Sequence, residues 1–348
     1  MSIQGVRVKQ RKFAAYYEGR KMAKARTLEE LLSMRRVRRL LGMLCLVSVI
    51  ALSLFTACAP SKEVEEMVSF PIEVTDQLGR VVKLEKVPER IISLAPSNTE
   101  ILFALGLGDR VVAVTDYCNY PPEAQAKPKI GGFTTTNIEK VVALSPDLVL
   151  AAQIQEKKII PVLEGKGLTI LALDPKTLDE VLKSITLVGE VTGKGEEASQ
   201  LVTEMRNRIK AVTAKTDNLP EAQRPRVFYI TWHDPLMTPG SGTRHNELIR
   251  MAGGTNTARD LTGYATISLE AVIEANPQII IAGVGMGSGE DLPFQYVRTE
   301  PRLRNVDARI NHRVYSIDVD LAGRPGPRIV DALEKFAEFL HPELFKKD

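Results

Sequence analysis

The sequence predicts an α/β protein of two similar lobes with parallel sheets, joined by one long α-helix, with a ligand cleft between the lobes. Three observations lead to this prediction. One pattern of helix and strand is written twice along the chain, apolar strands alternate with helical segments in each half, and a long helical stretch separates the halves.

The repeated pattern covers residues 138–151 and residues 269–282, at a constant offset of 131 residues with no gap. Glutamate, valine, proline and alanine coincide, and the apolar positions exchange only for other apolar residues. A period of this length is far too long for a solenoid. It therefore indicates two domains of similar build.

The first lobe is predicted over residues 71–185. Residues 72–84 alternate around a turn and are typical of a β-hairpin. Strands are predicted over residues 90–94, 111–115, 148–152 and 168–173. A helix is predicted from Glu100 to Leu105, with Ser97 or Asn98 as its cap and Gly106 as its end.

A linking helix is predicted over residues 186–217, within a helical pattern that begins near Thr177. Apolar residues recur there at helical spacing, and the residues between them suit a solvent-exposed face. They are Ala198, Leu201, Val202, Met205, Ile209 and Val212. A helix of about 20 residues reaches roughly 30 Å, about the width of a domain.

The second lobe is predicted over residues 218–348. Its expected strands are residues 226–230, 279–282 and 314–317, and its expected helices include residues 245–253 and a terminal amphipathic helix over residues 327–340. Because strands and helices alternate in both halves, each lobe is expected to be Rossmann-like.

The first 57 residues have the character of an export signal. They hold twelve Lys/Arg and three Asp/Glu, a local charge of +9. Within them, an apolar run over residues 40–55 follows the basic residues and is short for a membrane span. Cys58 follows Thr-Ala and resembles the acylated cysteine of a bacterial lipobox, although Phe55 stands where that motif usually has leucine. We expect lipidation at Cys58, a tether over residues 58–70, and a protein exported to the periplasm or outer surface.

Charge and motif content exclude several function classes. Because the whole chain carries +3, residues 58–348 carry −6, which argues against nucleic acid as a partner. The four histidines lack ligand spacing and no C-x-x-C motif occurs, so neither a metal site nor a resident cofactor is expected. No G-x-S-x-G elbow occurs, and nothing in the sequence calls for an enzyme.

Aromatic and charged residues gather at the ends of predicted strands. Tyr117, Phe133, Trp232 and Tyr264 lie in such loops, where parallel sheets form ligand pockets, although each ring could instead cap its own core. Asp320 and Arg324 flank the last loop before the terminal helix. They are expected either to pair with each other or to act as polar anchors in the cleft.

The two repeated glutamates, Glu139 and Glu270, each fall in the first turn of a short helix. Asn137 and Ser268 are the expected caps of these helices. One interpretation is charge–dipole stabilisation, worth about 0.3–1 kcal/mol. The other is a pair of exposed acidic groups, one per lobe, for a partner with two basic sockets.

The stretches Val74–Arg80 and Pro88–Glu100 resemble the entry signature of a known family. The family is that of ABC-importer substrate-binding proteins serving cobalamin, haem and ferric siderophores, and the resemblance covers residues 71–341. Residues 114–125 and 324–329 resemble most closely the cobalamin-binding members. The resemblance implies two lobes, a rigid linking helix and small closure movements.

The resemblance also implies roles for particular residues. Tyr117, Phe133, Tyr264, Asp320 and Arg324 fall where corrinoid contacts occur, and Trp232 is less securely matched. Phe133 and Tyr264 stand where the enteric cobalamin binder has tryptophans. By the same resemblance, Glu139 and Glu270 would dock onto arginines of the permease dimer.

The expected function is therefore a monomeric, lipid-anchored receptor that passes a corrinoid to an ABC permease dimer with its ATPase. A haem or ferric-siderophore receptor is the alternative within the family, and Tyr117 or Tyr264 could serve as a haem ligand. From other classes, an exported corrinoid-modifying enzyme and a sensor subunit remain as alternatives.

Overall fold

The protein is described here by a computed structural model, which covers residues 70–285 and 291–345. The chain divides into two compact units, and all described residues belong to the second unit, Met67–Asp348. The expected export signal, Cys58 and residues 58–69 of the tether lie outside the described residues. Within the described ranges, no helix is both long enough and apolar enough to cross a membrane.

The first lobe contains a parallel sheet of four strands in the order β4-β3-β5-β6. The strands are β3 Ile91–Ser93, β4 Val111–Val114, β5 Leu148–Ala152 and β6 Ile170–Leu173. The helices are α2 Pro96–Ala104, α3 Pro122–Gln125, α4 Ile138–Ala143, α5 Ile160–Glu164 and α6 Leu178–Thr192. The predicted hairpin is confirmed as β1 Ile72–Thr75 paired antiparallel with β2 Val81–Leu84.

The second lobe repeats this sheet in the order β10-β7-β12-β13, again all parallel. The strands are β7 Arg226–Ile230, β10 Thr255–Asn256, β12 Ile279–Val284 and β13 Val314–Asp318. The helices are α8 Arg244–Met251, α9 Leu269–Ala275, α10 Leu292–Thr299, α11 Asp307–Ile310, α12 Val319–Gly323, α13 Ile329–Leu340 and α14 Pro342–Phe345. In both sheets the second strand along the chain lies at one edge, followed by the first, third and fourth. The repeat in the sequence therefore corresponds to a repeat of the same sheet topology.

The second lobe also has a small antiparallel sheet that the sequence did not predict. Its strands are β8 Trp232–His233, β9 Leu236–Pro239 and β11 Tyr264–Thr266, in the order β11-β9-β8. These strands are too short to show an apolar alternation in the sequence.

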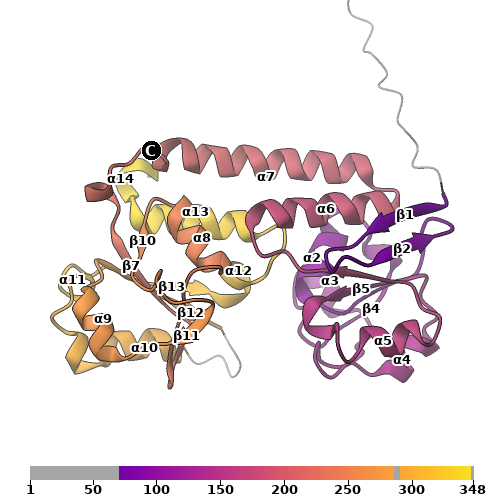
Figure 1. The fold of residues 1–348 in the computed structure, drawn as a ribbon, viewed down its shortest axis with the longest axis horizontal. Helices are drawn as coiled ribbons and strands as arrows, with labels where there is room; N and C mark the ends of the chain where they lie inside the picture. The colour runs from indigo at the N-terminus through magenta and orange to yellow at the C-terminus, as the bar shows by residue number, and fades with distance from the viewer. Residues whose placement is uncertain (1–69, 286–290, 346–348) are drawn as a thin grey trace, which may run out of the picture. The chain divides into compact units, whose positions relative to one another are not determined.

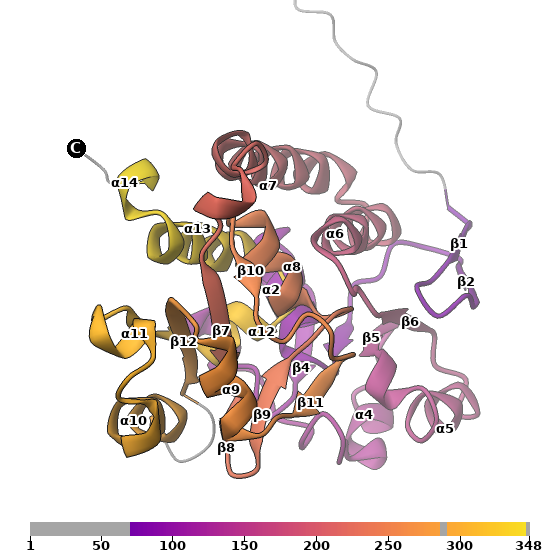
Figure 2. The same cartoon turned by 60° about the vertical axis from the view of Figure 1, so that its left-hand side comes forward.

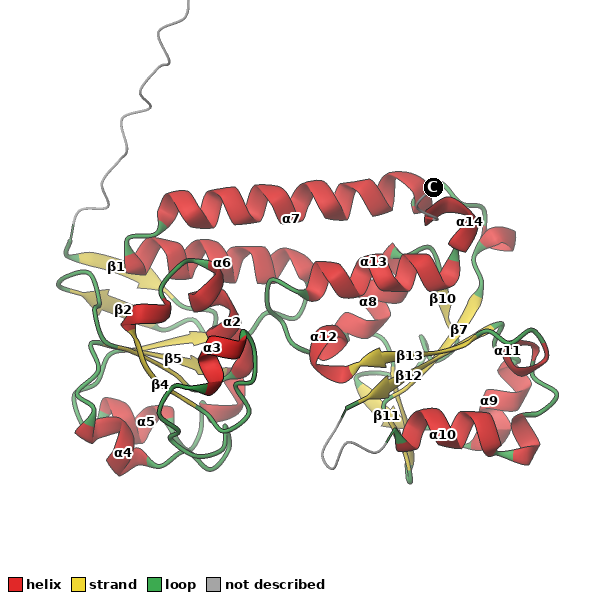
Figure 3. Ribbon diagram, turned by 180° about the vertical axis from the view of Figure 1, so that it is seen from behind, coloured by secondary structure: helices red, strands yellow, loops and turns green. Residues whose placement is uncertain are grey.

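Helices cover both faces of each parallel sheet, as the apolar strands require. In β3, Ile91 and Ile92 are fully buried but belong to different core clusters, one on each face of the sheet. Figures 1 and 3 show α6, α8 and α13 on the side of α7, and α4, α5, α9 and α10 on the other side. Both sheets are thus sandwiched between helical layers.

The linking helix is shorter than predicted. The helix expected over residues 186–217 is in fact the end of α6 followed by α7, Gly195–Thr216, because Gly193 at φ 70° ends α6. The predicted apolar stripe of α7 is confirmed, since Val202 and Met205 are buried. They share one core cluster with residues of both lobes, and α7 packs on α6, α8 and α13.

Two helix ends also differ from prediction. Helix α2 begins at Pro96 after Ala95, which provides no side-chain cap, so neither Ser97 nor Asn98 is the cap. Proline suits the first helical turn because its φ is already helical and its missing N–H would have no partner there. The terminal helix α13 begins at Ile329 rather than at residue 327.

Candidate ligand-binding site

The candidate site is a cavity of about 510 Å³ lined by residues of both lobes, a volume within the usual range for small-molecule sites. Its lining residues are Ala95, Pro96, Ser97, Tyr117, Phe133, Ala152, Gln153, Ile154, Leu173, Asp174, Pro175, Lys176, Arg244, Asp320, Gly323, Arg324 and Pro325. Of the six residues predicted to bind ligand, the structure brings Tyr117, Phe133, Asp320 and Arg324 together in this lining.

Tyr117 and Phe133 form the aromatic part of the cavity. Their ring centroids lie 5.6 Å apart at an interplanar angle of 79°, an edge-to-face arrangement. Buried Gln155 holds the backbone behind Phe133, because its Nε2 donates to the Phe133 carbonyl at 2.7 Å and to the Leu94 carbonyl at 2.8 Å. Tyr117 remains 57% exposed, so its ring is available to a ligand.

The polar part of the cavity comes from α12 and the residue that follows it. Arg324 pairs with Asp320 at 2.7 Å, so both the pairing and the cleft position expected from the sequence occur together. Asn119 of the first lobe connects to the pair, donating to Asp320 at 2.9 Å and accepting from Arg324 at 2.6 Å. Arg324 also donates to the Tyr117 carbonyl at 3.2 Å.

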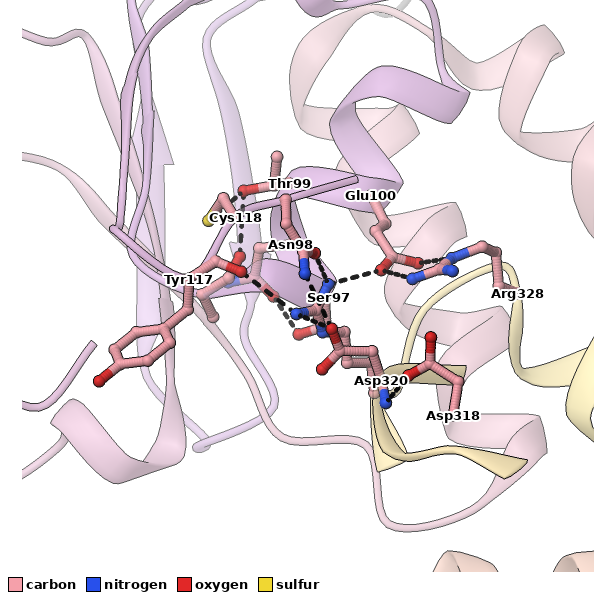
Figure 4. A network of polar contacts seen from close by, with 12 residues as sticks. Ser97, Asn98, Thr99, Glu100, Tyr117, Cys118, Asp318, Asp320 and Arg328 are labelled. Carbon is pink, nitrogen blue, oxygen red and sulfur yellow. Dashed lines mark hydrogen bonds and ion pairs between the residues drawn. The ribbon is translucent and has the colours of Figure 1, made fainter. Parts of the chain in front are cut away.

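Glu100 of the first lobe binds Arg324 and Arg328 of the second lobe, next to the polar part of the cavity. The sequence did not predict this contact between the lobes. The Glu100 side chain is 2% exposed and accepts from Arg328 at 2.6 Å and from Arg324 at 3.3 Å. Figure 4 shows the Glu100 carboxylate facing the Arg328 guanidinium, with Asp320 lower in the same group of polar contacts. The hydrogen bonds that Arg328 donates to the Glu100 carboxylate raise the pKa of Arg328 above its ordinary value.

Trp232 and Tyr264, which were also predicted to bind ligand, are not among the lining residues of this cavity. The indole of Trp232 lies on β8 and donates to the Asp234 carbonyl at 2.8 Å. The Tyr264 hydroxyl lies 3.0 Å from Nδ1 of buried His245. Both residues lie in the small antiparallel sheet, which the sequence did not predict.

Two further basic residues, Lys176 and Arg244, line the cavity and were missed by sequence reasoning. Arg244 is the first residue of α8, and Thr243 caps that helix. The sequence signal for Arg244 was its position directly after the helix cap Thr243, at the end of a glycine-rich turn. The predicted helix placed its start one residue later, at His245.

The repeated helices α4 and α9 match in detail. Asn137 caps α4 and Ser268 caps α9, as predicted. Glu139 and Glu270 are exposed in their first turns. Figures 1 and 2 show α4 and α9 on the side of this unit opposite α7.

The ends of these two helices also repeat. Ser145 and Asn276, again 131 residues apart, both have positive φ, at 45° and 41°. An arginine covers the free carbonyls at each end, Arg90 at Leu144 and Arg226 at Asn276, with Nη2–O distances of 2.6 and 2.9 Å. Each glutamate-bearing helix is therefore anchored to the first strand of its own parallel sheet.

The described residues contain no candidate metal-binding cluster. Within residues 70–285 and 291–345, no group of three or more His, Cys, Asp or Glu could hold a metal ion. Cys118 is buried and lies 3.1 Å from both Thr99 and Thr115 hydroxyls, which gives it a structural role.

Comparison with known proteins decides the family. The family model described as periplasmic binding protein matches residues 91–321, well over half of the chain. The chain belongs to the periplasmic binding protein family. A lipoprotein of Bacillus subtilis, named as an uncharacterized ABC transporter substrate-binding lipoprotein, is 35% identical over 82% of this chain and 91% of its own length. A vitamin B12-binding protein of Vibrio cholerae is 32% identical over 72% of this chain and 89% of its own length.

Solved structures of periplasmic binding proteins agree with the fold. The vitamin B12-binding protein of Vibrio cholerae matches with a TM-score of 0.62 and 30% identity, covering 75% of this chain and 99% of that chain. A periplasmic haem-binding protein in complex with two haems matches with a TM-score of 0.67 and 24% identity, covering 74% and 100%. The predicted fold class, two α/β lobes joined by a long helix, is confirmed. The named relatives are binding proteins, which agrees with the prediction of a non-enzymatic role.

Proposed function

We propose that this protein is the substrate-binding lipoprotein of an ABC importer and that its ligand is a corrinoid. The observation that carries the proposal is the cavity itself. Tyr117 and Phe133 supply an aromatic surface from the first lobe, and the Asp320–Arg324 pair supplies polar groups from the second. A large macrocycle needs both, because apolar burial provides affinity and a few polar groups fix orientation.

Similar proteins support the corrinoid assignment. Relatives named as cobalamin-binding and vitamin B12-binding proteins match most of the described chain at 29–32% identity. The lipoprotein name of the Bacillus relative supports a lipid anchor, which in this chain would be Cys58. On this proposal the protein is exported and works as a monomer.

The proposed partner is a permease dimer with its ATPase, docked through Glu139 and Glu270. Both carboxylates are exposed, and each stands in the first turn of a repeated helix. Glu270 forms one surface ion pair with Arg302 at 3.3 Å, with side chains 75% and 58% exposed. Exposed pairs of this kind contribute less than about 1 kcal/mol, so Arg302 is easily exchanged for an arginine of a partner.

The test is calorimetry on the full-length protein purified in detergent, titrated separately with cobalamin, haemin and a ferric siderophore. We expect one corrinoid bound per protein, recovered chemically unchanged by mass spectrometry. Binding of haemin or the siderophore without cobalamin would reject the corrinoid assignment. Recovery of an altered corrinoid would favour the alternative of an exported corrinoid-modifying enzyme.

Haem is the second candidate ligand, because the exposed Tyr117 phenol lies in the cavity and could ligate iron. A Soret band that forms on adding haemin and is lost in Tyr117→Phe would support it. Tyr264 is less suited to this role, because its hydroxyl is already engaged with His245.

A further inference from the structure

Arg244 differs from the other charged residues of the cavity because its hydrogen-bond partners are backbone carbonyls rather than carboxylates. It lies at the start of α8 and its guanidinium contacts two backbone carbonyls, one from each lobe. The Nη1 group donates to the Pro175 carbonyl at 2.8 Å, and the Nη2 group donates to the Gly323 carbonyl at 3.0 Å. These bonds hold the cation at a fixed place where the two lobes meet.

The other charged residues of the lining are already paired. Lys176 pairs with Asp174 at 2.5 Å, and Arg324 pairs with Asp320 at 2.7 Å. Within the described part of the chain, both carboxylates of the cavity therefore have a cationic partner, whereas Arg244 bonds only to neutral carbonyls. The charges of the described lining residues sum to +1. Arg244 is the cation among them that hydrogen-bonds to no carboxylate, although Asp174 and Glu247 lie close enough to interact with its charge.

Part of the Arg244 guanidinium also lacks a partner. Its Nε is buried and makes no hydrogen bond to any described residue. A guanidinium has five N–H donors, and the two carbonyls use only two of them. Burial lowers the pKa of Arg244, but an arginine side chain stays protonated at neutral pH. A buried cation with free donors favours an anionic oxygen acceptor.

We propose that Arg244 is a specificity-determining residue that binds one anionic oxygen group, a phosphate or a carboxylate, at the edge of the bound ligand. This rests on the proposed function. In a corrinoid, the matching group is the phosphodiester of the nucleotide tail. A corrinoid without that tail lacks the anion but keeps the macrocycle, so the tail contact and the macrocycle contact are separable.

The experiment compares cobalamin with cobinamide, which lacks the nucleotide tail, by calorimetry on the full-length protein in detergent. We expect the unsubstituted protein to bind cobalamin at least about tenfold more tightly than cobinamide, as one charge-assisted hydrogen bond would give. Arg244→Gln should weaken cobalamin binding about 10- to 100-fold and cobinamide binding less than threefold. Arg244→Lys, which keeps the charge, should lie between the two.

Arg250→Gln is the matched control, because Arg250 is an exposed arginine at the other end of α8. It should leave both affinities unchanged. Equal affinity of the unsubstituted protein for cobalamin and cobinamide overturns the role of Arg244 without any variant. Equal weakening of both ligands by Arg244→Gln overturns it as well, because the residue would then act only through the fold.

A different outcome separates the corrinoid proposal from the role of Arg244. If the unsubstituted protein binds neither corrinoid but binds haemin, the corrinoid proposal fails and the anion comes from a carboxylate. The comparison is then haemin with its dimethyl ester. A preference for haemin that Arg244→Gln removes supports the role of Arg244, and equal binding of the two porphyrins overturns it.

Discussion

Glu100 and Arg328 are joined by two hydrogen bonds although 228 residues separate them along the chain. Arg328 Nη2 lies 2.6 Å from Glu100 Oε1, and Arg328 Nε lies 3.0 Å from Glu100 Oε2. The same guanidinium lies 3.9 Å from the centre of the Tyr120 ring. Since Arg324 also reaches Glu100, one buried carboxylate connects the ligand cavity to the contact between the lobes.

Glu100→Gln should lower the free energy of unfolding by about 3 kcal/mol, measured by urea denaturation. Removing one member of a buried ion pair leaves the other charge without compensation. Here Arg328 loses its carboxylate partner, whereas Arg324 keeps its pair with Asp320. Glu338→Gln breaks the exposed pair with Lys335 and should change the stability by less than about 0.5 kcal/mol. Equal losses of unfolding free energy in the two variants would show that burial of the Glu100 ion pair adds nothing to the stability.

His245 should make the protein less stable as the pH falls. Burial, together with the charge of Arg244, lowers the pKa of His245 to about 3. The unfolded chain then binds a proton near pH 6.5 that the folded protein refuses until about pH 3, so stability is lost across this window. The expected loss is about 2 kcal/mol between pH 7 and pH 5.

Urea denaturation at pH 7 and at pH 5 measures this loss. In His245→Gln the part due to this residue should disappear. His312→Asn, at an exposed histidine with φ 56°, should keep the full pH dependence. An unchanged pH dependence in His245→Gln would contradict the assignment.

Gly189→Ala should destabilise the protein by about 1–3 kcal/mol, because α6 and α7 approach too closely there for a side chain. A Cβ at Gly189 would lie 2.3 Å from the Ala198 Cβ and 2.8 Å from the Lys194 carbonyl. A Cβ at Gly195 meets nothing within 4 Å, so Gly195→Ala should be neutral or stabilising by about 0.5 kcal/mol. Thermal denaturation of the two variants checks the difference, and a neutral Gly189→Ala would contradict the close contact.

Phe133→Ala should weaken corrinoid binding about 10- to 100-fold, because it removes one of the two aromatic rings of the cavity. Trp232→Ala should change the affinity less than threefold, because Trp232 is not among the lining residues. Calorimetry measures both. A larger loss from Trp232→Ala than from Phe133→Ala would restore the original sequence prediction for Trp232.

Glu139→Lys combined with Glu270→Lys should reduce uptake of labelled corrinoid by cells more than about tenfold, since like charges would then oppose each other at the permease. The affinity for free corrinoid should not change, because neither residue lines the cavity. Glu190→Lys reverses one exposed charge on α6, half the charge change of the double variant, and should leave uptake intact. Normal uptake by the double variant would reject the proposed docking surface.

Much of the fold could be predicted because it depends on residues near each other in the chain. The 131-residue repeat predicted two domains of similar build, and the structure shows that their parallel sheets share one strand order. The caps at Asn137 and Ser268 were predicted correctly, because a cap and its N–H partner stand three residues apart. The end of α6 at Gly193 was not predicted, because a glycine can continue or stop a helix according to its packing.

The candidate site was predicted in part for a related reason. Ligand pockets form at the ends of parallel strands, and this rule selected Tyr117 and Phe133, which do line the cavity. Trp232 and Tyr264 are not among these lining residues and lie instead in a second sheet of very short strands, which the sequence did not predict.

The sequence by itself determined the two lobes, the long helix between them and the short helices that carry Glu139 and Glu270. Only the tertiary structure decided that Glu100 is buried against Arg324 and Arg328, and that Arg244 enters the cavity bonded to carbonyls alone. The reason is physical. Helices, strands and caps follow from local periodicity and nearby hydrogen bonds, whereas the burial and partners of a charged side chain depend on segments that meet only after folding.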